Sequence, residues 1–429
     1  MKHTKRYIWA MSLLAATLTL LAGCSADDDG GRTDIAGPRT PVLLKAEVNA
    51  STTRGGITGN IDYTVLTKKG NAFGVFAYGV NGGDWINKEV TYTLDDNDAL
   101  GSVHMHTGSW KYAGDTLIWD NQIISFLAYA PYVVESDFGD TGITGITAPP
   151  DEDNIEEKVK NTKIEYTIAT DPTKSVDLLW GVREEANKEG KKRLPWLNTA
   201  IKDTTGVLNV TKGGGVTFTF HHALTAIGFH VQAMIDKDND LGDYEDESNV
   251  DGILDKYKIT LENITLKGKK NGFRKQAVLN LNNTEPGKPS WGDYKDWEES
   301  LTVGNSNINA EFRHRNESAK GVSQQAEQLV ITPNSEGAEQ CFFVIPNENK
   351  QDYTLVLEWY VNEERHENEI EIKDWALNPE TKYYINLVIG LKSVRLNVTA
   401  TDWENKPVNI DDIFEHGTSA NESLARPSR

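Results

Sequence analysis

The sequence predicts an all-β fold made of two β-sandwich domains. Short runs rich in aromatic and β-branched side chains recur along the chain and are separated by turn residues, which is typical of strands. No long segment has the periodicity of an amphipathic helix. A chain of 429 residues is too long for a single hydrophobic core, so two sandwich domains are expected.

The first predicted strand covers residues 42–48, after a polar segment that we interpret as a tether. Apolar and charged residues alternate in it, as in a strand with one buried face. The residues expected on the buried face are Val42, Leu44, Ala46 and Val48. A polar loop rich in glycine follows at residues 51–56 and ends this region.

The first domain is expected to span residues 55–212. Its clearest strands are residues 73–78, 123–132, 164–168 and 177–181. Short helices are expected within residues 151–161 or 182–192. Residues 183–214 are charged and then rich in glycine, so we place the domain boundary there.

The second domain is expected to span residues 213–414. Its first strand, at residues 216–222, alternates regularly, but the apolar phase then changes, which predicts a bulge or a corner near residues 223–226. A similar change lies between Leu261 and Ile264. Further strands are expected at residues 341–345, 353–361, 383–389 and 394–400. Residues 415–429 form a polar tail without a strand pattern, and disorder is expected there.

The amino terminus has the pattern of an export signal. Positive residues precede an apolar run at residues 8–22, which is shorter than the ~20 residues of a membrane-spanning helix. Residues 1–23 are therefore interpreted as a signal peptide. Leu21-Ala22-Gly23-Cys24 resembles a lipobox, in which Cys24 is acylated; the alternative is an ordinary signal with a chance cysteine. The acidic residues 25–29 resemble a surface-export tag, or form only a solvated tether.

Charge and cysteine content exclude several classes of protein. The formal net charge of −20 argues against binding to nucleic acid or to anionic lipid head groups. The only cysteine after Cys24 is Cys341, so the mature chain has no internal disulfide. Cys341 lies in an apolar strand and is expected to pack as a small hydrophobe.

No motif indicates an enzyme or a cofactor site. The sequence lacks a nucleophile elbow, a zinc-protease pair and a phosphate loop, and its many carboxylates are those of an acidic surface. His104 and His106 share a strand face, which would suit zinc. His221 and His222 point to opposite faces, and His222 is in phase with apolar neighbours, so a hydrogen-bonded core histidine is expected. We therefore expect no catalytic residues and no cofactor.

One acidic loop resembles the opening of a calcium site. Its candidate ligands are Asp236, Asp238, Asp240 and Glu247. Leu241 stands where such a loop requires glycine, and the flanking segments are strand-like. A solvated acidic loop is the simpler interpretation, and calcium stays an alternative.

Aromatic side chains offer a second possible binding site. Trp291, Tyr294 and Trp297 lie in a polar segment that contains glycine and proline, which we interpret as a loop region. Exposed aromatic rings there could stack on sugars, whereas loop aromatics more often pack back on a sheet. The alternative function is accordingly that of a surface glycan-binding lipoprotein.

Several segments, taken in order, resemble the fimbrillin family, the lipoprotein pilins of type V pili. These segments are the lipobox at Cys24, residues 42–48, Arg54 in its Gly/Ser/Thr loop, Val216-Thr-Phe-Thr-Phe-His-His-Ala-Leu, Lys382-Tyr-Tyr-Ile-Asn-Leu and residues 394–403. The resemblance covers most of residues 20–414. Each of these motifs is a loose pattern, and the resemblance rests on the order in which they occur along the chain.

The resemblance implies two transthyretin-like Greek-key β-sandwich domains, a palmitoylated lipoprotein on the outer membrane and a later place in a fimbrium that supports adhesion. It implies that an arginine-specific protease cuts between Arg54 and Gly55, because Arg32 and Arg39 precede the first strand. Loss of residues 24–54 would open a groove that a strand from another subunit fills. The implied partners are copies of the chain or other pilins, and a host or bacterial surface ligand.

The strand given to a neighbour is less defined. Val394, Leu396, Val398 and Ala400 alternate well, and Val408 and Ile410 alternate before Asp411 and Asp412 interrupt the pattern. The polar tail after Phe414 departs from what is expected of a stalk subunit. Stalk, tip and anchor positions all stay open.

Overall fold

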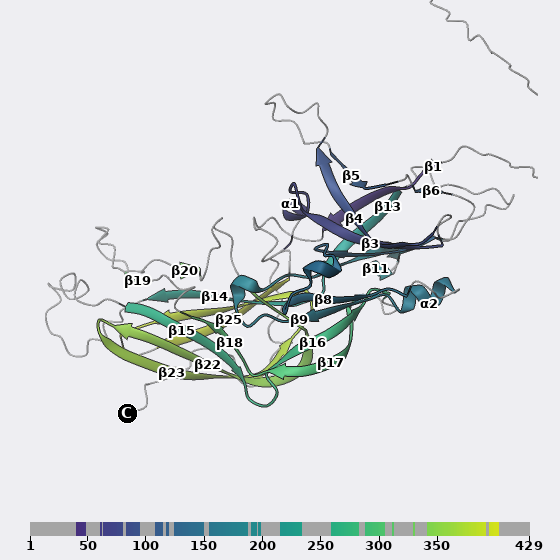
Figure 1. Cartoon of the computed structure of the whole chain (residues 1–429). Coiled ribbons are helices and arrows are strands. Elements are labelled where there is room, and N and C mark those ends of the chain that lie inside the picture. The colour runs from purple at the N-terminus through teal and green to yellow at the C-terminus, as the bar shows by residue number, and fades with distance from the viewer. Residues whose placement is uncertain are drawn as a thin grey trace, which may run out of the picture. The chain divides into compact units, whose positions relative to one another are not determined.

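The computed structural model shows an all-β chain (Figure 1). It describes residues 40–48, 61, 63–79, 83–94, 108–114, 117–119, 124–149, 154–187, 190–194, 196–198, 215–233, 259–282, 288–304, 311–312, 329–330, 341–391 and 394–402. The α-helices in these residues are short, α1 (Tyr63–Leu66) and α2 (Ile155–Lys160). No helix in this part of the chain is long and apolar enough to cross a membrane. The predicted all-β fold is confirmed.

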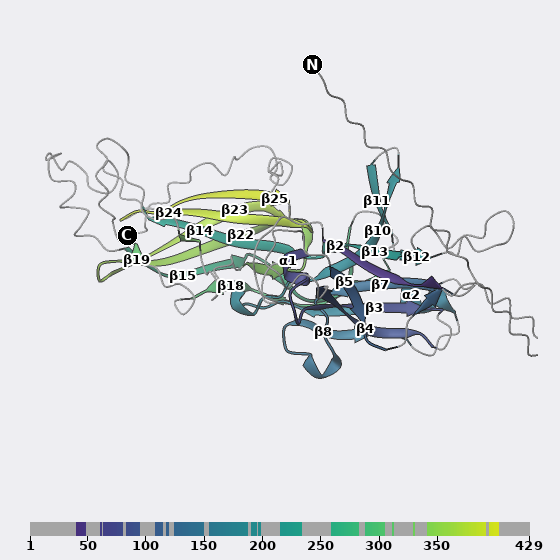
Figure 2. The ribbon, with the colours of Figure 1, turned by 90° about the horizontal axis from the view of Figure 1, so that it is seen from above.

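The largest sheet of the described residues has nine strands. Their order is β2 (Leu43–Val48), β13 (Gly215–His222), β10 (Leu179–Asn187), β7 (Ile124–Ala130), β3 (Ala72–Tyr78), β4 (Trp85–Leu94) and β5 (Gly108–Tyr112), with β11 (Gly190–Leu194) beside β10 and β12 (Trp196–Asn198) beside β7. A separate small pair joins β1 (Thr40–Pro41) to β6 (Ile118–Trp119). Figure 2 shows β2 running along β13.

Both faces of the central strands in this sheet are buried. On β3, Phe73, Val75 and Ala77 pack into a smaller core, whereas Phe76 and Tyr78 point into a larger one. Strands that are covered on both sides read as continuous apolar runs rather than alternating ones. The sheet therefore separates two cores, and the smaller one is the core to which β2 contributes.

A four-stranded sheet combines segments from distant parts of the chain. Its order is β17 (Ser290–Glu298), β16 (Phe273–Asn280), β9 (Lys163–Thr167) and β8 (Gly142–Thr147). Its inward side chains, such as Ile164, Tyr166 and Leu279, belong to the larger core. The sheet packs in this way against the face of β3 that carries Phe76 and Tyr78, which gives a sandwich-like arrangement.

Two more sheets form the carboxy-terminal part. One has the order β20 (Leu329–Val330), β14 (Thr225–Ala233), β24 (Thr381–Ile389) and β25 (Val394–Asp402), with β21 (Phe342–Val344) beside β14; the other has β18 (Ser300–Val303), β15 (Ile259–Gly268), β22 (Asn347–Val361) and β23 (Glu364–Leu377), with β19 (Glu311–Phe312) beside β15. Their inward residues share the larger core, as in a β-sandwich. A register shift between Leu261 and Asn263 gives the bulge expected there.

Two local expectations receive different answers. The phase change near residues 223–226 is a corner, where the chain passes from β13 in one sheet to β14 in another. Of the two alternatives for a short helix, residues 151–161 are confirmed, since they contain α2, whereas a helix at residues 182–192 is wrong, because this segment forms the β10–β11 hairpin. Val182 is fully buried and lies opposite Thr219 of β13, so pairing with a distant strand overrides the charged local sequence.

The sheets do not divide at the boundary placed near residue 213. β13 follows that boundary, yet it pairs with β2 and β10 of the amino-terminal part. β16 and β17 likewise join β8 and β9. Sheet membership depends on long-range pairing, which local composition does not reveal. The division of the chain into two domains stays a prediction.

Candidate functional site: the amino-terminal strand and its core

β2 is an edge strand that pairs in parallel with β13. Leu44 lies opposite Val216 and Ala46 lies opposite Phe218 in this register. Parallel partners are joined by evenly spaced, slanted hydrogen bonds, so β2 satisfies one row of backbone groups along β13. The strand's own outer edge is unpaired among the described residues.

The alternation of residues 42–48, which are β2 and the residue before it, places their apolar side chains in the smaller core. Val42, Leu44 and Ala46 are at most 4% exposed, and Val48 packs against the same core from a partly buried position. Leu43 points outward and is 53% exposed. The predicted inward face is therefore the observed one, and the strand covers aromatic residues of β3 and β13 such as Phe73 and Phe218.

The start of this segment is tied to the opposite end of the nine-stranded sheet. The Val42 amide donates to the Leu117 carbonyl at 2.8 Å, next to the β1–β6 pair. The Tyr112 hydroxyl of β5 donates to the Val42 carbonyl at 3.3 Å and accepts from the Leu117 amide at 3.1 Å. Burial raises the pKa of Tyr112, which keeps this hydroxyl protonated. Val42 therefore links the two end strands of the nine-stranded sheet, β2 and β5, across the seam between them.

The chain is anchored again just after the loop that follows β2. The Ile61 amide donates to Asp177 Oδ2 at 3.0 Å, and His222 Nδ1 lies 2.7 Å from the same oxygen. Asp177 is 0% exposed and His222 is 1% exposed. This confirms His222 as a hydrogen-bonded core histidine, and it fixes residue 61 independently of β2.

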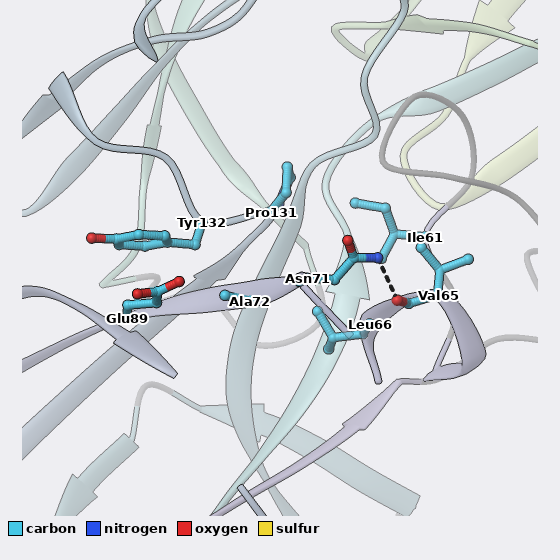
Figure 3. Close-up of a pocket in the computed structure, with 9 residues that line it drawn as sticks. Ile61, Val65, Leu66, Asn71, Ala72, Glu89, Pro131 and Tyr132 are labelled. Atoms are coloured by element: carbon cyan, nitrogen blue, oxygen red, sulfur yellow. Dashed lines mark hydrogen bonds between the residues drawn. The ribbon is translucent and has the colours of Figure 1, made fainter. Parts of the chain in front are cut away.

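A small hollow lies beside α1, in the segment that continues from Ile61 (Figure 3). Ile61, Val65 and Leu66 give it an apolar wall, while Tyr132 lies on its other side. Asn71 Nδ2 donates to the Val65 carbonyl at 2.6 Å and holds the last turn of the helix. Val65 and Leu66 are buried in the smaller core, so α1 fills part of the space beneath the sheet.

Many predicted site residues lie outside the described residues. They are the lipidation residue Cys24, the arginines Arg32, Arg39 and Arg54 with Gly55, the histidines His104 and His106, the acidic loop residues Asp236, Asp238, Asp240 and Glu247, and the candidate donor residues Val408 and Ile410. Their roles stay predictions. Where the chain is described, no three His, Cys, Asp or Glu side chains gather as a metal site would require.

The other candidate donor residues belong to this chain's own sheet. Val394, Leu396, Val398 and Ala400 lie on β25, which pairs with β24 over its whole length. All four are at most 7% exposed and are part of the larger core. Donation of β25 to a neighbour would open that core. The other two candidates, Val408 and Ile410, lie outside the described residues.

His221 and Cys341 are both buried within the fold. His221 is 2% exposed and lies between two carboxylates, 3.0 Å from Glu184 Oε1 and 3.2 Å from Glu380 Oε1. Cys341 is buried in the larger core, as expected of a cysteine that packs as a small hydrophobe.

The predicted loop around Trp291, Tyr294 and Trp297 is wrong, because these residues lie on β17. The strand pairs with β16 through a bulge between Gln276 and Val278. Trp291 packs against the larger core and donates its ring N–H to the Ala223 carbonyl at 2.8 Å. The other two aromatic side chains are exposed.

No family model matches the sequence, and no curated protein matches it. Among solved structures, a fimbrial protein from Bacteroides vulgatus is similar, with a TM-score of 0.49 and 17% identity over 85% of this chain and 99% of that one. A putative cell adhesion protein from Bacteroides uniformis has a TM-score of 0.42 and 14% identity over 85% and 99%. One from Bacteroides ovatus has a TM-score of 0.36 and 13% identity over 87% and 100%.

Proposed function

We propose that this chain is a structural subunit of cell-surface fimbriae. It is exported as a lipoprotein through Cys24, reaches the outer surface of the outer membrane, and is matured by an arginine-specific protease that cuts after Arg54. It then assembles by exchange of strands between subunits and supports adhesion. No catalytic step and no cofactor belong to this function. The observation that carries the proposal is β2, an edge strand that is part of a core.

The position of Arg54, between β2 and the next anchored residue, is consistent with release of β2 after a cut. Residues 49–60 join β2 to Ile61, and Arg54 lies within them. On one side of the cut, β2 is held by pairing and packing, and Val42 just before it by hydrogen bonds to Leu117 and Tyr112; on the other side Ile61 is held by buried Asp177. A cut at Arg54 would free β2 without loosening α1.

Loss of β2 exposes an apolar groove. Val42 and Leu44 each lose burial that stabilises the fold by about 1.5–3 kcal/mol, and Ala46 adds a smaller amount. The row of backbone groups along β13 also loses its partner, which makes that edge a template for another strand. A strand from a second subunit with apolar residues at alternate positions restores both contributions. Val408 and Ile410 are the candidates that this chain offers.

Limited proteolysis tests the proposal. The chain without residues 1–24 keeps every described residue and is treated briefly with an arginine-specific protease. Unheated samples are then run on a denaturing gel beside Arg54→Ala. A matched control, Arg39→Ala, removes an arginine that precedes β2. We expect a ladder of multimers from the parent chain and from Arg39→Ala, and none from Arg54→Ala.

Mass spectrometry of the same samples separates cutting from assembly. A multimer ladder together with release of the fragment that ends at Arg54 supports the proposal. Complete cutting at Arg54 with only monomer would contradict assembly from copies of this chain. A ladder that persists in Arg54→Ala would show that β2 is not the strand that leaves.

A further inference from the structure

β17 carries two large aromatic side chains that are exposed to solvent. Tyr294 is 45% exposed and Trp297 is 41% exposed. Within the described part of the chain the large exposed hydrophobic residues are Leu43, Tyr63, Ile86, Tyr294 and Trp297. Two of them therefore lie on one strand, and that strand is the outer strand of its sheet (Figure 1).

These two rings share a face with an arginine that is held in place. The Arg274 guanidinium carbon lies 3.8 Å from the centre of the Tyr294 ring, and its Nη1 donates to the Pro346 carbonyl at 2.8 Å. Trp297 lies directly opposite Arg274 in the β16–β17 register, and opposite residues of an antiparallel pair point to the same face. We name Arg274, Tyr294 and Trp297 the β17 platform.

The backbone of β17 argues against use of this edge for strand pairing. Asp293 and Asp296 have φ angles of 47° and 54°, in the left-handed region. A bulge opposite Gln276 further distorts the strand. Charged residues, bulges and distorted backbone are the features that prevent the addition of a strand to an edge. A partner would therefore contact the side chains of the platform rather than pair with the backbone of β17.

The surroundings of the rings indicate the kind of partner. Asp293, Lys295 and Asp296 are exposed next to them and offer carboxylate acceptors and an ammonium donor. An aromatic ring packs against the apolar C–H face of a pyranose, while carboxylates accept hydrogen bonds from its hydroxyl groups. The two aspartates and the net charge of −20 disfavour anionic ligands.

We propose that the β17 platform binds a neutral saccharide, with the rings of Tyr294 and Trp297 as the stacking surface and Arg274 as the residue that positions Tyr294. Because Arg274, itself bonded to the Pro346 carbonyl, holds the Tyr294 ring before any ligand arrives, this ring needs little ordering on binding. This site is separate from β2 and does not depend on strand exchange.

Saturation-transfer NMR on the purified full chain tests the site. The probes are four neutral hexasaccharides, namely an α-1,4-glucan, a β-1,4-glucan, a β-1,4-mannan and a β-1,4-galactan, each titrated to millimolar concentration. We expect transfer to the ring protons of at least one probe. Trp297→Ala and Tyr294→Ala should each weaken its binding by about tenfold or more, whereas Tyr294→Phe should retain it.

The matched control is Tyr63→Ala, which removes a tyrosine of similar exposure outside the platform and should bind as the parent chain does. Thermal unfolding of each variant verifies that the fold is intact. Absence of transfer to all four probes would overturn the proposal. So would binding that Trp297→Ala and Tyr294→Ala leave unchanged, or variants that alter only self-association of the chain.

Discussion

His222 is a titratable side chain that the fold encloses completely. It is 1% exposed, and its Nδ1 lies 2.7 Å from Asp177 Oδ2. Burial lowers the pKa of His222 below its ordinary value of about 6.5; Asp177 and Glu380 oppose this shift, and Lys382 adds to it. Burial outweighs the two carboxylates, so the neutral imidazole is the form that the folded chain favours.

This pKa shift predicts a pH dependence of stability. Below about pH 6.5 the unfolded chain takes up a proton at His222 more readily than the folded chain does. The free energy of unfolding should therefore fall as the pH decreases from 7 to 5. His222→Asn keeps a hydrogen-bond donor for Asp177 but does not titrate, and urea unfolding of this variant should show a shallower dependence over the same range.

The comparison isolates one histidine among the nine in the chain. Equal slopes for the parent chain and His222→Asn would contradict the predicted role of His222. The sequence predicted that this residue is in the core, because it is in phase with Phe218 and Phe220. Its partner, Asp177, lies 45 residues away and could not be inferred from spacing.

At the scale of a single element, β2 offers two adjacent leucines with opposite environments. Leu44 is 3% exposed in the smaller core, whereas Leu43 is 53% exposed. Leu44→Ala should lower the free energy of unfolding by about 2–5 kcal/mol, because it removes buried methyl groups and leaves a cavity. Leu43→Ala should change it by about 0.5 kcal/mol or less. Urea unfolding of both variants measures the difference.

The pair is informative because residue type and strand are held constant. Similar values for Leu43→Ala and Leu44→Ala would mean that β2 does not pack with this face inward in solution. A large effect at Leu43 alone would indicate a shift of one residue in register, since such a shift exchanges the two faces of a strand.

The sequence predicts a strand correctly where one face of the strand is buried and the other is exposed, because apolar and polar residues then alternate. The alternation of residues 42–48 predicted β2 and its inward face, and the phase change after residue 222 predicted the corner before β14. The patterns failed for β17 and for the β10–β11 hairpin after residue 181, where the sequences are largely polar. Those strands are fixed by pairing with β16 or within the hairpin, and local composition does not encode such partners.

At the scale of the whole molecule, the sheets combine segments that are distant in sequence. β2 pairs with β13 across more than 160 residues, and β9 pairs with β16 across about 110. The fold class follows from strand patterns, but this topology does not, because pairing partners are chosen by the packing of complete faces. The candidate site shares this limit: the sequence predicted β2 and its apolar face, but neither β13 as its partner nor the seam at Tyr112.

The parallel pairing of β2 with β13 gives a way to separate cutting from strand release. After a cut at Arg54 only non-covalent contacts hold β2 in place, namely its pairing, its packing and the hydrogen bonds of Val42, and assembly by strand exchange would require β2 to leave. Lys45 and Thr217 lie opposite each other on the outward face of the two strands. Neighbouring strands are about 4.8 Å apart, which lies within the Cα separation that a disulfide spans. Cysteines at both positions would lock β2 without disturbing the core.

We expect the double variant Lys45→Cys/Thr217→Cys, in the chain without residues 1–24, to be cut after Arg54 when oxidised but to remain monomeric on an unheated denaturing gel. Reduction of the same cut sample should restore the multimer ladder, because β2 can then leave its groove. The single variant Lys45→Cys, which cannot form the bond, should assemble under both conditions. Multimers from the oxidised double variant would show that subunits join without the departure of β2, and strand exchange at β13 would then be excluded.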